Sequence, residues 1–517
     1  MKAKKSNYKI EALGILWAVI LNVMKDMRAL YPSTTLRVTI LLTYYYICMN
    51  NFHFAKIIAG VGPTLAKETV LSKIINMVDA FRITLSQGFD DNNKKYIDTI
   101  MKLDNSKTVM LEMKGADLRI KNVLNVKAKE WAVITVEYSE YAQENNKRIF
   151  IDAPFLRELP KGNKIKFEQS GVVLKVKEIL PEAINCEVVK WGEVLQFDRV
   201  LFDKYDVDAA FLTDKDKKDL LRWLEYGVNM VIASMVKTKH DIMELKAFLT
   251  SQNADKMKVF AKIETEEALK NIDDIIETSD WIILCFDKIV EAMKAKKIEE
   301  RALIKKCKNV GKPVMVTFIG TRNAWKYKLI NESAVKRFCT LAVDGYMIDT
   351  MIREEDPLDI VTELFEMLEK NELKLEDNKL DRFYEDDNDQ EVRDYIIYNA
   401  YRITREIDVR AMVTFTENGY TSGRLSSLAP MVPVISFTKV DETYRYLNLL
   451  RGVRGYKISQ SFDYENLKRI GKEMIRIIFK GNISLDDKII IVQANEMIKD
   501  ERTDMINGVE LYKFKNI

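Results

Sequence analysis

The stretch from residue 258 to residue 288 constrains the fold most, because its pattern predicts a strand, a helix and a second strand in direct succession. The first strand is apolar and ends in the sequence K-I-E, in which Lys262 and Glu264 are the polar members. Apolar residues at helical spacing predict the helix over 266–278, and 281–285 form a second buried strand. Residues two apart on a strand point to the same side, and in a βα barrel that strand end carries the catalytic groups. The alternative for such a pair is an ordinary exposed surface pair.

Composition narrows the class of protein. A chain of 517 residues predicts several domains, and 81 Lys and Arg against 78 Asp and Glu, a net charge of +3, give no reason to expect a nucleic-acid or acidic-membrane partner. Only two histidines are present, which argues against a histidine-built zinc site or a Ser-His-Asp hydrolase. Five scattered cysteines without a C-x-x-C pair predict a reducing compartment, and we expect the cytoplasm.

The first 50 residues are predicted to be an N-terminal extension. Its two apolar runs, 13–23 and 38–49, are both shorter than the roughly 20 residues that a membrane-spanning helix needs. We therefore favour a pair of buried or interfacial helices over a membrane anchor. A third alternative is that Met49 is the true start and residues 1–48 are absent from the mature chain.

The stretch around Lys262 resembles the centre of pyruvate kinases. That family has a strand ending in S-K-I-E-N, a helix, and then S-D-G-I-M-V-A-R-G-D-L-G; this chain has A-K-I-E-T from Ala261 and S-D-W-I-I-L-C-F-D-K from Ser279. Three earlier segments resemble the family's opening motifs in the same order: A-K-I-I-A-G-V-G-P from Ala55, F-R-I-T-L-S-Q-G from Phe81 and L-E-M-K-G-A-D-L-R from Leu111. The resemblance, which extends to about residue 514, implies an α/β fold: a TIM (β/α)8 barrel with an inserted β-barrel lid domain and a C-terminal α/β domain.

The resemblance also divides the chain into domains. Short alternating segments such as 131–136 and 172–176 predict half-buried strands for the insertion, and a charged stretch poor in apolar residues predicts a linker. The predicted parts are 1–50 as the extension, 51–118 as the first part of the barrel, 119–205 as the inserted lid, 206–370 as the rest of the barrel, 371–390 as the linker and 391–517 as the C-terminal domain.

The implied reaction is the glycolytic transfer of a phosphoryl group from phosphoenolpyruvate to ADP. The resemblance implies that Lys262 stabilises charge on the phosphoryl group and the enolate, and that Arg82 and Arg119 contact phosphate. It implies that Glu264 is one ligand of the catalytic Mg²⁺. Such catalysis depends on positioning and charge neutralisation, with the metal at its centre.

Three further sites are implied by resemblance. The potassium ligands are Ser86, Thr84 in place of an asparagine, and Glu112 in place of an aspartate. The substrate contacts are Lys114, Ser234 and Thr317. A Ser/Thr-rich loop before a helix suits an effector phosphate, although such a loop is also often a simple helix cap; its residues are Thr416, Thr421 and Ser422.

The chain departs from the family at several site positions. Lys288 stands where the aspartate of R-G-D supplies the second metal ligand, Phe318 where the family has a threonine, and Gln87 where it has a histidine. We therefore favour a catalytically impaired or inactive chain that serves as a structural or regulatory subunit, in a homo- or hetero-tetramer with other pyruvate kinase chains.

Two alternatives stay open. The chain is a divergent but active enzyme if the loop slips by one residue, so that Asp287 becomes the metal ligand; the 23-residue spacing from Lys288 to Gly311 is about two residues shorter than the family's. The third hypothesis is a phosphate-sensing scaffold without an enzymatic partner.

Overall fold

The structure is a computed structural model. It describes residues 53–62, 65–85, 91–115, 118–139, 141–153, 155–168, 170–196, 198–203, 210–226, 228, 230–318, 331–348, 357–372, 389–458, 464–479, 483–494 and 508–516. The predicted extension over 1–50 and most of the predicted linker lie outside these residues, as do Ser86 and Gln87.

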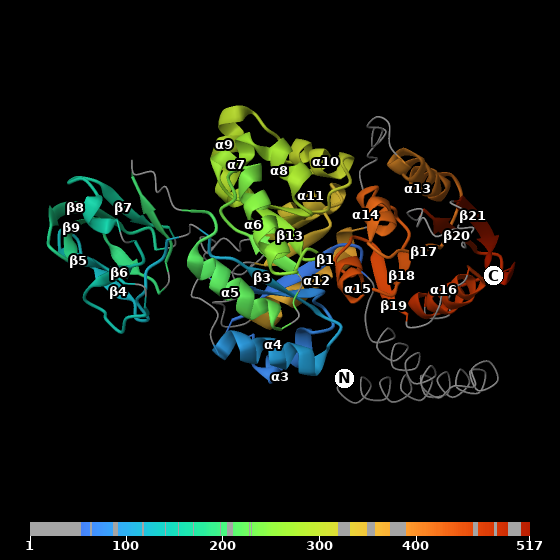
Figure 1. Cartoon of the computed structure of the whole chain (residues 1–517), viewed down its shortest axis with the longest axis horizontal. Coiled ribbons are helices and arrows are strands. Elements are labelled where there is room, and N and C mark those ends of the chain that lie inside the picture. Colours follow the sequence, from blue (N-terminus) through green and yellow to red (C-terminus); the bar gives the residue numbers. More distant parts are fainter. Residues whose placement is uncertain are drawn as a thin grey trace, which may run out of the picture.

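Eight parallel strands close into a barrel at the centre of the molecule (Figure 1). Around the barrel their order is β1-β16-β15-β14-β13-β12-β3-β2. Their bounds are β1 (Lys56–Gly60), β2 (Ala80–Thr84), β3 (Thr108–Glu112), β12 (Met230–Ala233), β13 (Lys258–Ile263), β14 (Trp281–Leu284), β15 (Val314–Phe318) and β16 (Gly345–Ile348). The TIM barrel predicted from the motif order is thereby confirmed.

Helices cover the outside of the barrel (Figure 1). They are α3 (Glu68–Ile74), α4 (Asp91–Leu103), α5 (Asp214–Leu224), α6 (Lys239–Ser251), α7 (Glu266–Lys270), α8 (Ile272–Thr278), α9 (Phe286–Lys296), α10 (Glu300–Asn309), α11 (Glu332–Thr340) and α12 (Pro357–Asn371). The single helix predicted over 266–278 is wrong in one detail, because it is broken at Asn271 into α7 and α8. The Asn271 side chain donates to the carbonyl of Lys237 at 3.0 Å, a contact with another segment that periodicity does not reveal.

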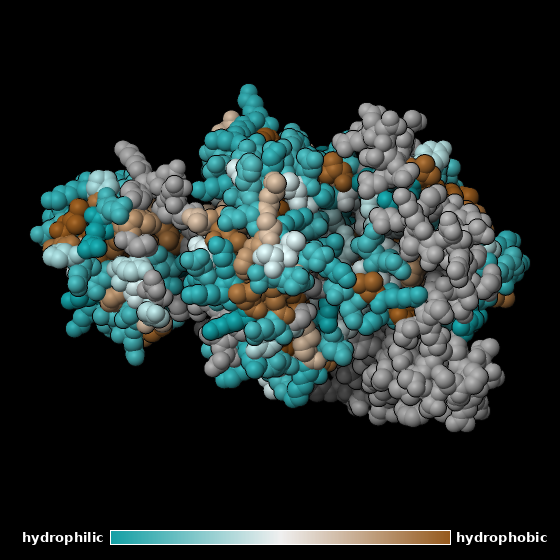
Figure 2. Space-filling model, in the orientation of Figure 1, coloured by the Kyte–Doolittle hydropathy of each residue, from teal (hydrophilic) through white to brown (hydrophobic). Residues whose placement is uncertain are grey.

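The inserted domain is all-β and lies to one side of the barrel (Figure 1). A six-stranded mixed sheet has the order β11-β7-β8-β9-β5-β6, and a two-stranded ribbon pairs β10 with β4. The elements are β4 (Val126–Ala128), β5 (Val133–Tyr138), β6 (Ile149–Ile151), η1 (Leu156–Glu158), β7 (Lys164–Phe167), β8 (Val173–Ile179), β9 (Ala183–Lys190), β10 (Gly192–Val194) and β11 (Val200–Phe202). The domain has an apolar core of its own, while Figure 2 shows further apolar patches on its outer surface.

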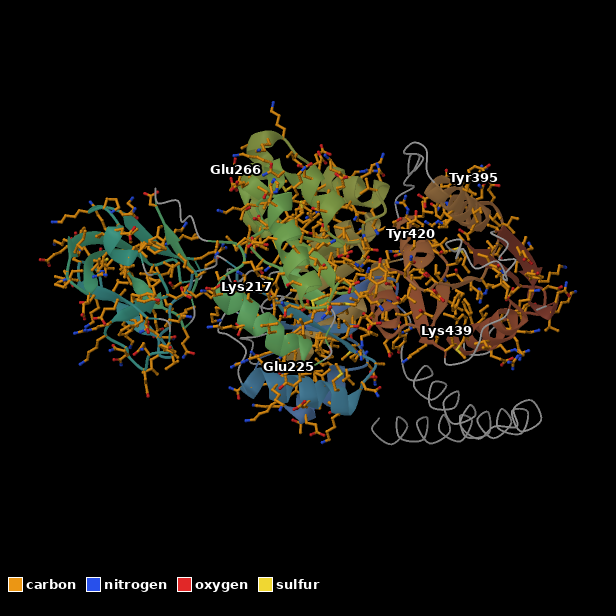
Figure 3. The ribbon with its side chains drawn as sticks, viewed as in Figure 1. Lys217, Glu225, Glu266, Tyr395, Tyr420 and Lys439 are labelled. Atoms are coloured by element: carbon orange, nitrogen blue, oxygen red, sulfur yellow. The ribbon has the colours of Figure 1, made fainter. Side chains whose placement is uncertain are left out.

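The C-terminal domain is an α/β sheet of five strands in the order β19-β18-β17-β20-β21, with only β21 antiparallel among them. Its elements are α13 (Asp389–Glu406), β17 (Ala411–Phe415), α14 (Tyr420–Ser427), β18 (Val434–Thr438), α15 (Asp441–Leu447), β19 (Val453–Lys457), α16 (Tyr464–Ile478), β20 (Lys488–Gln493), β21 (Gly508–Lys513) and η3 (Phe514–Asn516). Tyr420 donates to Asp394 at 2.6 Å, which fastens α14 to α13 near Tyr395 (Figure 3). In the part of the chain described, no helix combines the length and apolar character needed to cross a lipid bilayer.

The barrel and the C-terminal domain share one apolar core. Inward-facing barrel residues such as Phe260 and Trp281 belong to the same buried cluster as Leu425 and Leu450 of the C-terminal domain. Trp281, the first residue of β14, meets the ring of Tyr446 edge-on at 6.0 Å. Because this contact lies where the strand begins, the C-terminal domain closes the amino end of the barrel and leaves the carboxyl ends of the strands for the site.

A buried ion pair crosses the same interface. Lys308 Nζ lies 2.6 Å from Asp344 Oδ2. Asp344 also accepts from the Val314 N–H at 2.8 Å and from Ser426 Oγ of the C-terminal domain at 3.2 Å. Burial lowers the pKa of Lys308, and Asp344 opposes that effect. Removing one partner of such a pair leaves an uncompensated charge in the interior.

We expect Asp344→Ala to destabilise the protein by roughly 3–5 kcal/mol, because it leaves Lys308 buried without its counter-charge. The shift of the thermal unfolding midpoint measures this effect. Asp359→Ala, which removes an exposed carboxylate from α12, is the matched control. A midpoint shift no larger than that of the control would contradict the assignment.

Candidate functional site

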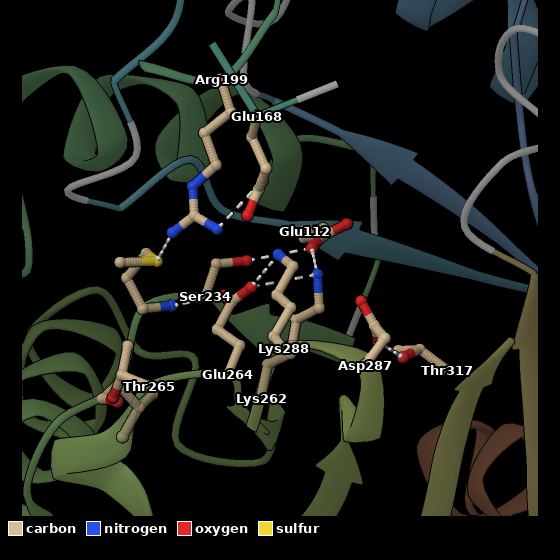
Figure 4. A network of polar contacts seen from close by, with 12 residues as sticks. Glu112, Glu168, Arg199, Ser234, Lys262, Glu264, Thr265, Asp287, Lys288 and Thr317 are labelled. Atoms are coloured by element: carbon tan, nitrogen blue, oxygen red, sulfur yellow. Dashed lines mark hydrogen bonds and ion pairs between the residues drawn. The ribbon is translucent and has the colours of Figure 1, made fainter. Parts of the chain in front are cut away.

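Four barrel strands bring polar side chains together at their carboxyl ends. Arg82 comes from β2, Glu112 ends β3, Ser234 follows β12 and Lys262 lies near the end of β13. Glu112 accepts from all three of the others. Its Oε2 accepts from Arg82 Nη1, and its Oε1 accepts from Lys262 Nζ at 2.6 Å and from Ser234 Oγ at 3.0 Å (Figure 4). The parallel register of the strands places Thr84 and Ile232 beside Glu112, and this register brings the four polar side chains into contact.

Both oxygens of Glu112 are therefore neutralised by cations. Burial alone raises the pKa of this carboxyl group, but Arg82 and Lys262 outweigh burial and lower its pKa to about 2. Glu112 is thus ionised over the whole physiological pH range. This carboxylate is positioned more as a counter-ion than as a proton donor.

Glu264 is the second carboxylate of the site. Thr265 follows it directly and begins α7 by accepting from the Ala268 N–H at 3.0 Å, so β13 ends at the point where Glu264 projects. The Met235 N–H donates to Glu264 Oε1 at 2.9 Å, while Lys288 Nζ lies 2.5 Å from Oε2 and Lys262 Nζ 3.7 Å from it. Burial raises the pKa of Glu264, but Lys262 and Lys288 hold it well below its usual range.

Lys288 reaches Glu264 from the first turn of α9. That helix begins at Phe286, directly after the end of β14. Burial lowers the pKa of Lys288, but Glu264 reverses this effect and the net pKa is raised, so the side chain is an ammonium at neutral pH. The neighbouring Asp287 turns instead toward Thr317, whose Oγ1 lies 3.5 Å from its carboxylate (Figure 4).

The described side chains do not fit a divalent magnesium ion. Mg²⁺ needs oxygen ligands in near-octahedral geometry, yet both oxygens of Glu264 are engaged and two ammonium groups lie within 3.7 Å of one of them. Among the described residues, no three His, Cys, Asp or Glu side chains gather in a way that could hold a metal. Glu112, expected as a potassium ligand, is likewise neutralised by a guanidinium and an ammonium.

Lys114 and Arg119 lie at the junction between the barrel and the inserted domain. Asp152 of the inserted domain accepts from Lys114, from Lys121 at 3.2 Å and from the Arg119 N–H at 3.1 Å. Lys114 precedes a glycine of φ +60° at which a Cβ atom would lie only 2.8 Å from the Ser234 carbonyl oxygen. The K-G pair therefore lets the chain pass close to the site before it enters the inserted domain.

Arg199 is a site residue that the sequence did not single out. Its backbone forms a bridge to Arg119, and its guanidinium lies 3.4 Å from Glu168 and 3.0 Å from the Met235 sulfur. It also contributes to the low pKa of Glu264. Only the pairing of Arg119 with a residue 80 positions later (199 − 119) brings it to the site; no local motif carries that signal.

The three expected effector residues are buried in the C-terminal domain, and each hydroxyl has an internal partner. Thr416 Oγ1 accepts from the Gly419 N–H at 3.0 Å, Thr421 Oγ1 donates to the Ala494 carbonyl at 2.8 Å, and Ser422 shares a hydrogen bond of 2.8 Å with Ser436. A phosphate would have to displace these contacts. Effector binding at this loop stays a prediction.

The remaining positions that the sequence singled out are the other expected potassium ligands and two positions at which the chain departs from the family. Thr84 ends β2 and pairs in register with Glu112, so the structure brings two expected potassium ligands together. Ser86 and Gln87 lie outside the described residues, and Phe318 is the last residue of β15. The potassium site stays a prediction.

The lowered pKa of Glu112 gives a pH dependence with a definite sign. Its ion pairs stabilise the fold fully above the ordinary pKa near 4.5, and this contribution disappears as the pH falls through the folded value of about 2. We expect Glu112→Gln to destabilise the protein by roughly 3 kcal/mol at neutral pH and by progressively less below pH 4.5, as measured by unfolding midpoints across pH. Glu291→Gln, on the exposed face of α9, is the control; a pH-independent difference would contradict the ion-pair assignment.

Comparisons with known proteins match this architecture. The family model for the pyruvate kinase barrel domain matches residues 52–319, and that for the pyruvate kinase alpha/beta domain matches residues 394–507. The pyruvate kinase of Clostridium perfringens is 26% identical over 438 residues, which cover 81% of this chain and 92% of that protein. The pyruvate kinase of Staphylococcus aureus strain MRSA252 is 24% identical over 421 residues, covering 77% of this chain and 71% of that protein.

A solved structure gives the same result for the fold. The crystal structure of Cryptosporidium parvum pyruvate kinase superimposes with a TM-score of 0.77 at 18% identity, covering 91% of this chain and 99% of that chain. The barrel match alone spans more than half of the 517 residues, and the second match covers most of the C-terminal domain. The chain belongs to the pyruvate kinase family.

Proposed function

We propose that this member of the pyruvate kinase family does not catalyse magnesium-dependent phosphoryl transfer on its own. It acts as a structural or regulatory subunit beside active pyruvate kinase chains in the cytoplasm. The ion pair between Lys288 and Glu264 is the observation that carries the proposal, because the Lys288 ammonium engages the carboxylate oxygen that a metal would need.

The electrostatics of the pair support this proposal. A divalent ion beside Glu264 would stand next to two ammonium groups, and like charges at such distances repel strongly where water is excluded. The partners are also mutually stabilised, because each moves the pKa of the other toward its charged form. Displacing Lys288 would leave that ammonium without its counter-ion.

The subunit role is supported by what the chain has kept. The barrel, the inserted domain and the C-terminal domain are all present, and the likeness to the Cryptosporidium parvum enzyme extends over 91% of the chain. A fold kept so completely around an altered metal position suits a protein whose surfaces are used in assembly. The contact of Asp287 with Thr317 does not favour the alternative in which Asp287 serves as the metal ligand.

We expect the purified chain to form no measurable ATP from phosphoenolpyruvate and ADP with Mg²⁺ present, because Lys288 opposes metal binding. The Clostridium perfringens enzyme assayed in parallel is the positive control. Metal-dependent turnover that is lost in Asp287→Ala would overturn the proposal in favour of the shifted-ligand enzyme. Turnover retained in Asp287→Ala would exclude both.

Lys288→Asp should create affinity for Mg²⁺, because it replaces the opposing ammonium with a second carboxylate beside Glu264. Calorimetry should detect magnesium binding in this variant but not in the wild type. Lys288→Ala is the matched control, since it removes the ammonium without adding a ligand. Magnesium binding by the wild type, abolished by Glu264→Ala, would show that the metal site survives.

The subunit role has its own test. Affinity-tagged chain expressed in its native cells should co-purify with a catalytically active pyruvate kinase, and light scattering should give the mass of a hetero-oligomer. A chain recovered as a monomer without a pyruvate kinase partner would contradict this role.

A further inference from the structure

Four lysines gather on the outer face of the six-stranded sheet in the inserted domain. Strand alternation directs Lys164 and Lys166 of β7 away from the core of this domain, because the residues between and after them are buried in it. Lys175 of β8 lies directly opposite Lys164 in the antiparallel register and therefore shares this face. Lys190, at the end of β9, lies opposite Val173 on the same side of the sheet. All four lysine side chains are exposed.

The charges of these lysines are not used within the fold. In the part of the chain that the structure describes, none of the four forms an ion pair or a side-chain hydrogen bond. Glu187 lies opposite Lys175 and is the acidic residue that the register places among them, so their formal charge sums to +3 (4 − 1). Like charges directly opposite each other on neighbouring strands are destabilising, and Lys164 and Lys175 are placed in this way. This arrangement indicates a contact with something outside the chain.

Two exposed tryptophans border the lysines. Trp131 lies in the turn before β5 and is 73% exposed, whereas Trp191 follows Lys190 directly and is 66% exposed. The turn that holds Trp131 lies beside the end of β9, because the Ala132 carbonyl accepts from the Val188 N–H at 2.9 Å. The same two strands also carry two exposed valines, Val133 and Val189.

The backbone holds Trp131 in a conformation that a bulky residue rarely adopts. The Ala132 N–H donates to the Lys129 carbonyl at 3.1 Å, which closes a turn in which Trp131 has a φ of +60°. Glycine or asparagine is the usual residue at such a position. An indole that is mostly exposed gains little from burial. Packing within the chain therefore does not account for a tryptophan in this turn.

The residue types on this face distinguish between classes of partner. Its cations are all lysines, whereas protein–protein interfaces are depleted in lysine, and arginine is the preferred residue for recognising nucleic acids. Lysines are attracted to anionic lipids, and tryptophan rings are favoured at the level of the lipid headgroups. The nearly balanced charge of the whole chain does not oppose this attraction, because it acts only within a Debye length of the membrane.

We propose that this lysine–tryptophan face docks on the surface of a membrane that contains anionic lipids. The face is formed by Trp131, Lys164, Lys166, Lys175, Lys190 and Trp191. The inserted domain, which carries the face, forms one end of the molecule (Figure 1). The lysines supply the electrostatic attraction, and the indoles enter the headgroup region. This contact goes beyond the proposed function and does not depend on whether the chain is active.

The probe is a suspension of unilamellar vesicles made of phosphatidylcholine and phosphatidylserine, and the readout is the fraction of the full-length chain that sediments with them. We expect binding to these vesicles that weakens steeply as the salt concentration rises, because salt screens the attraction between lysines and lipids. We expect no binding to vesicles of phosphatidylcholine alone, since they carry no net negative charge.

Variants of the face separate it from the rest of the chain. Lys164→Ala combined with Lys175→Ala should weaken vesicle binding at least about tenfold. The matched control is Lys294→Ala combined with Lys296→Ala, which removes two exposed lysines from α9 and should bind like the wild type. Trp131→Asn should also weaken binding but should not lower the midpoint of thermal unfolding, because asparagine tolerates a positive φ.

The proposal is overturned if the wild type does not bind the phosphatidylserine vesicles, or if it binds phosphatidylcholine vesicles equally well. Neither result depends on the folding of a variant, and circular dichroism checks the folding of each variant. Vesicle binding that survives the loss of Lys164 and Lys175 would place the contact in another part of the chain and would also overturn the proposal. Capture of a single-stranded oligonucleotide through these two lysines, without vesicle binding, would assign the face to a nucleic acid instead.

Discussion

Five side chains of alternating sign form a string across the carboxyl ends of the barrel strands: Arg82, Glu112, Lys262, Glu264 and Lys288. Each carboxylate lies between two cations, and Lys262 lies between both carboxylates. Burial of an isolated ion is very unfavourable, and only close pairing offsets it. The string is therefore stable as a unit, and its electrostatics determine which ions the site accepts.

Position along the string decides what each member does. Lys262 is the middle member, so its loss would leave Glu112 and Glu264 facing each other as like charges. Lys288 is the terminal member, and Glu264 is the one carboxylate that it contacts among the residues the structure describes.

The sequence predicted the barrel because its motifs occur in a fixed order, each at the end of an apolar strand. It also predicted that Lys262 and Glu264 share a side, since strand alternation is a local property. Arg199 and Asp152 could not be predicted, because pairings between distant segments bring them to the site. The direction of the Asp287 side chain could not be predicted from the sequence either. Adjacent residues at the start of α9 point to different partners, Thr317 and Glu264, and only the packed helix fixes which residue faces which.

The apolar cores lie apart from the site, which explains how the fold accommodates a lysine at position 288 in place of a carboxylate. The apolar cores lie around the outside of the barrel strands and, inside the barrel, continue into the C-terminal domain. The ion string lies at the opposite end of the strands, where a helix start rather than a packed side chain sets the position of Lys288. A carboxylate and a lysine at this position differ by two units of charge but remove no apolar contact from either core. The fold therefore constrains the string only through the requirement that each buried carboxylate has a close cation, and the Lys288 ammonium meets that requirement for Glu264.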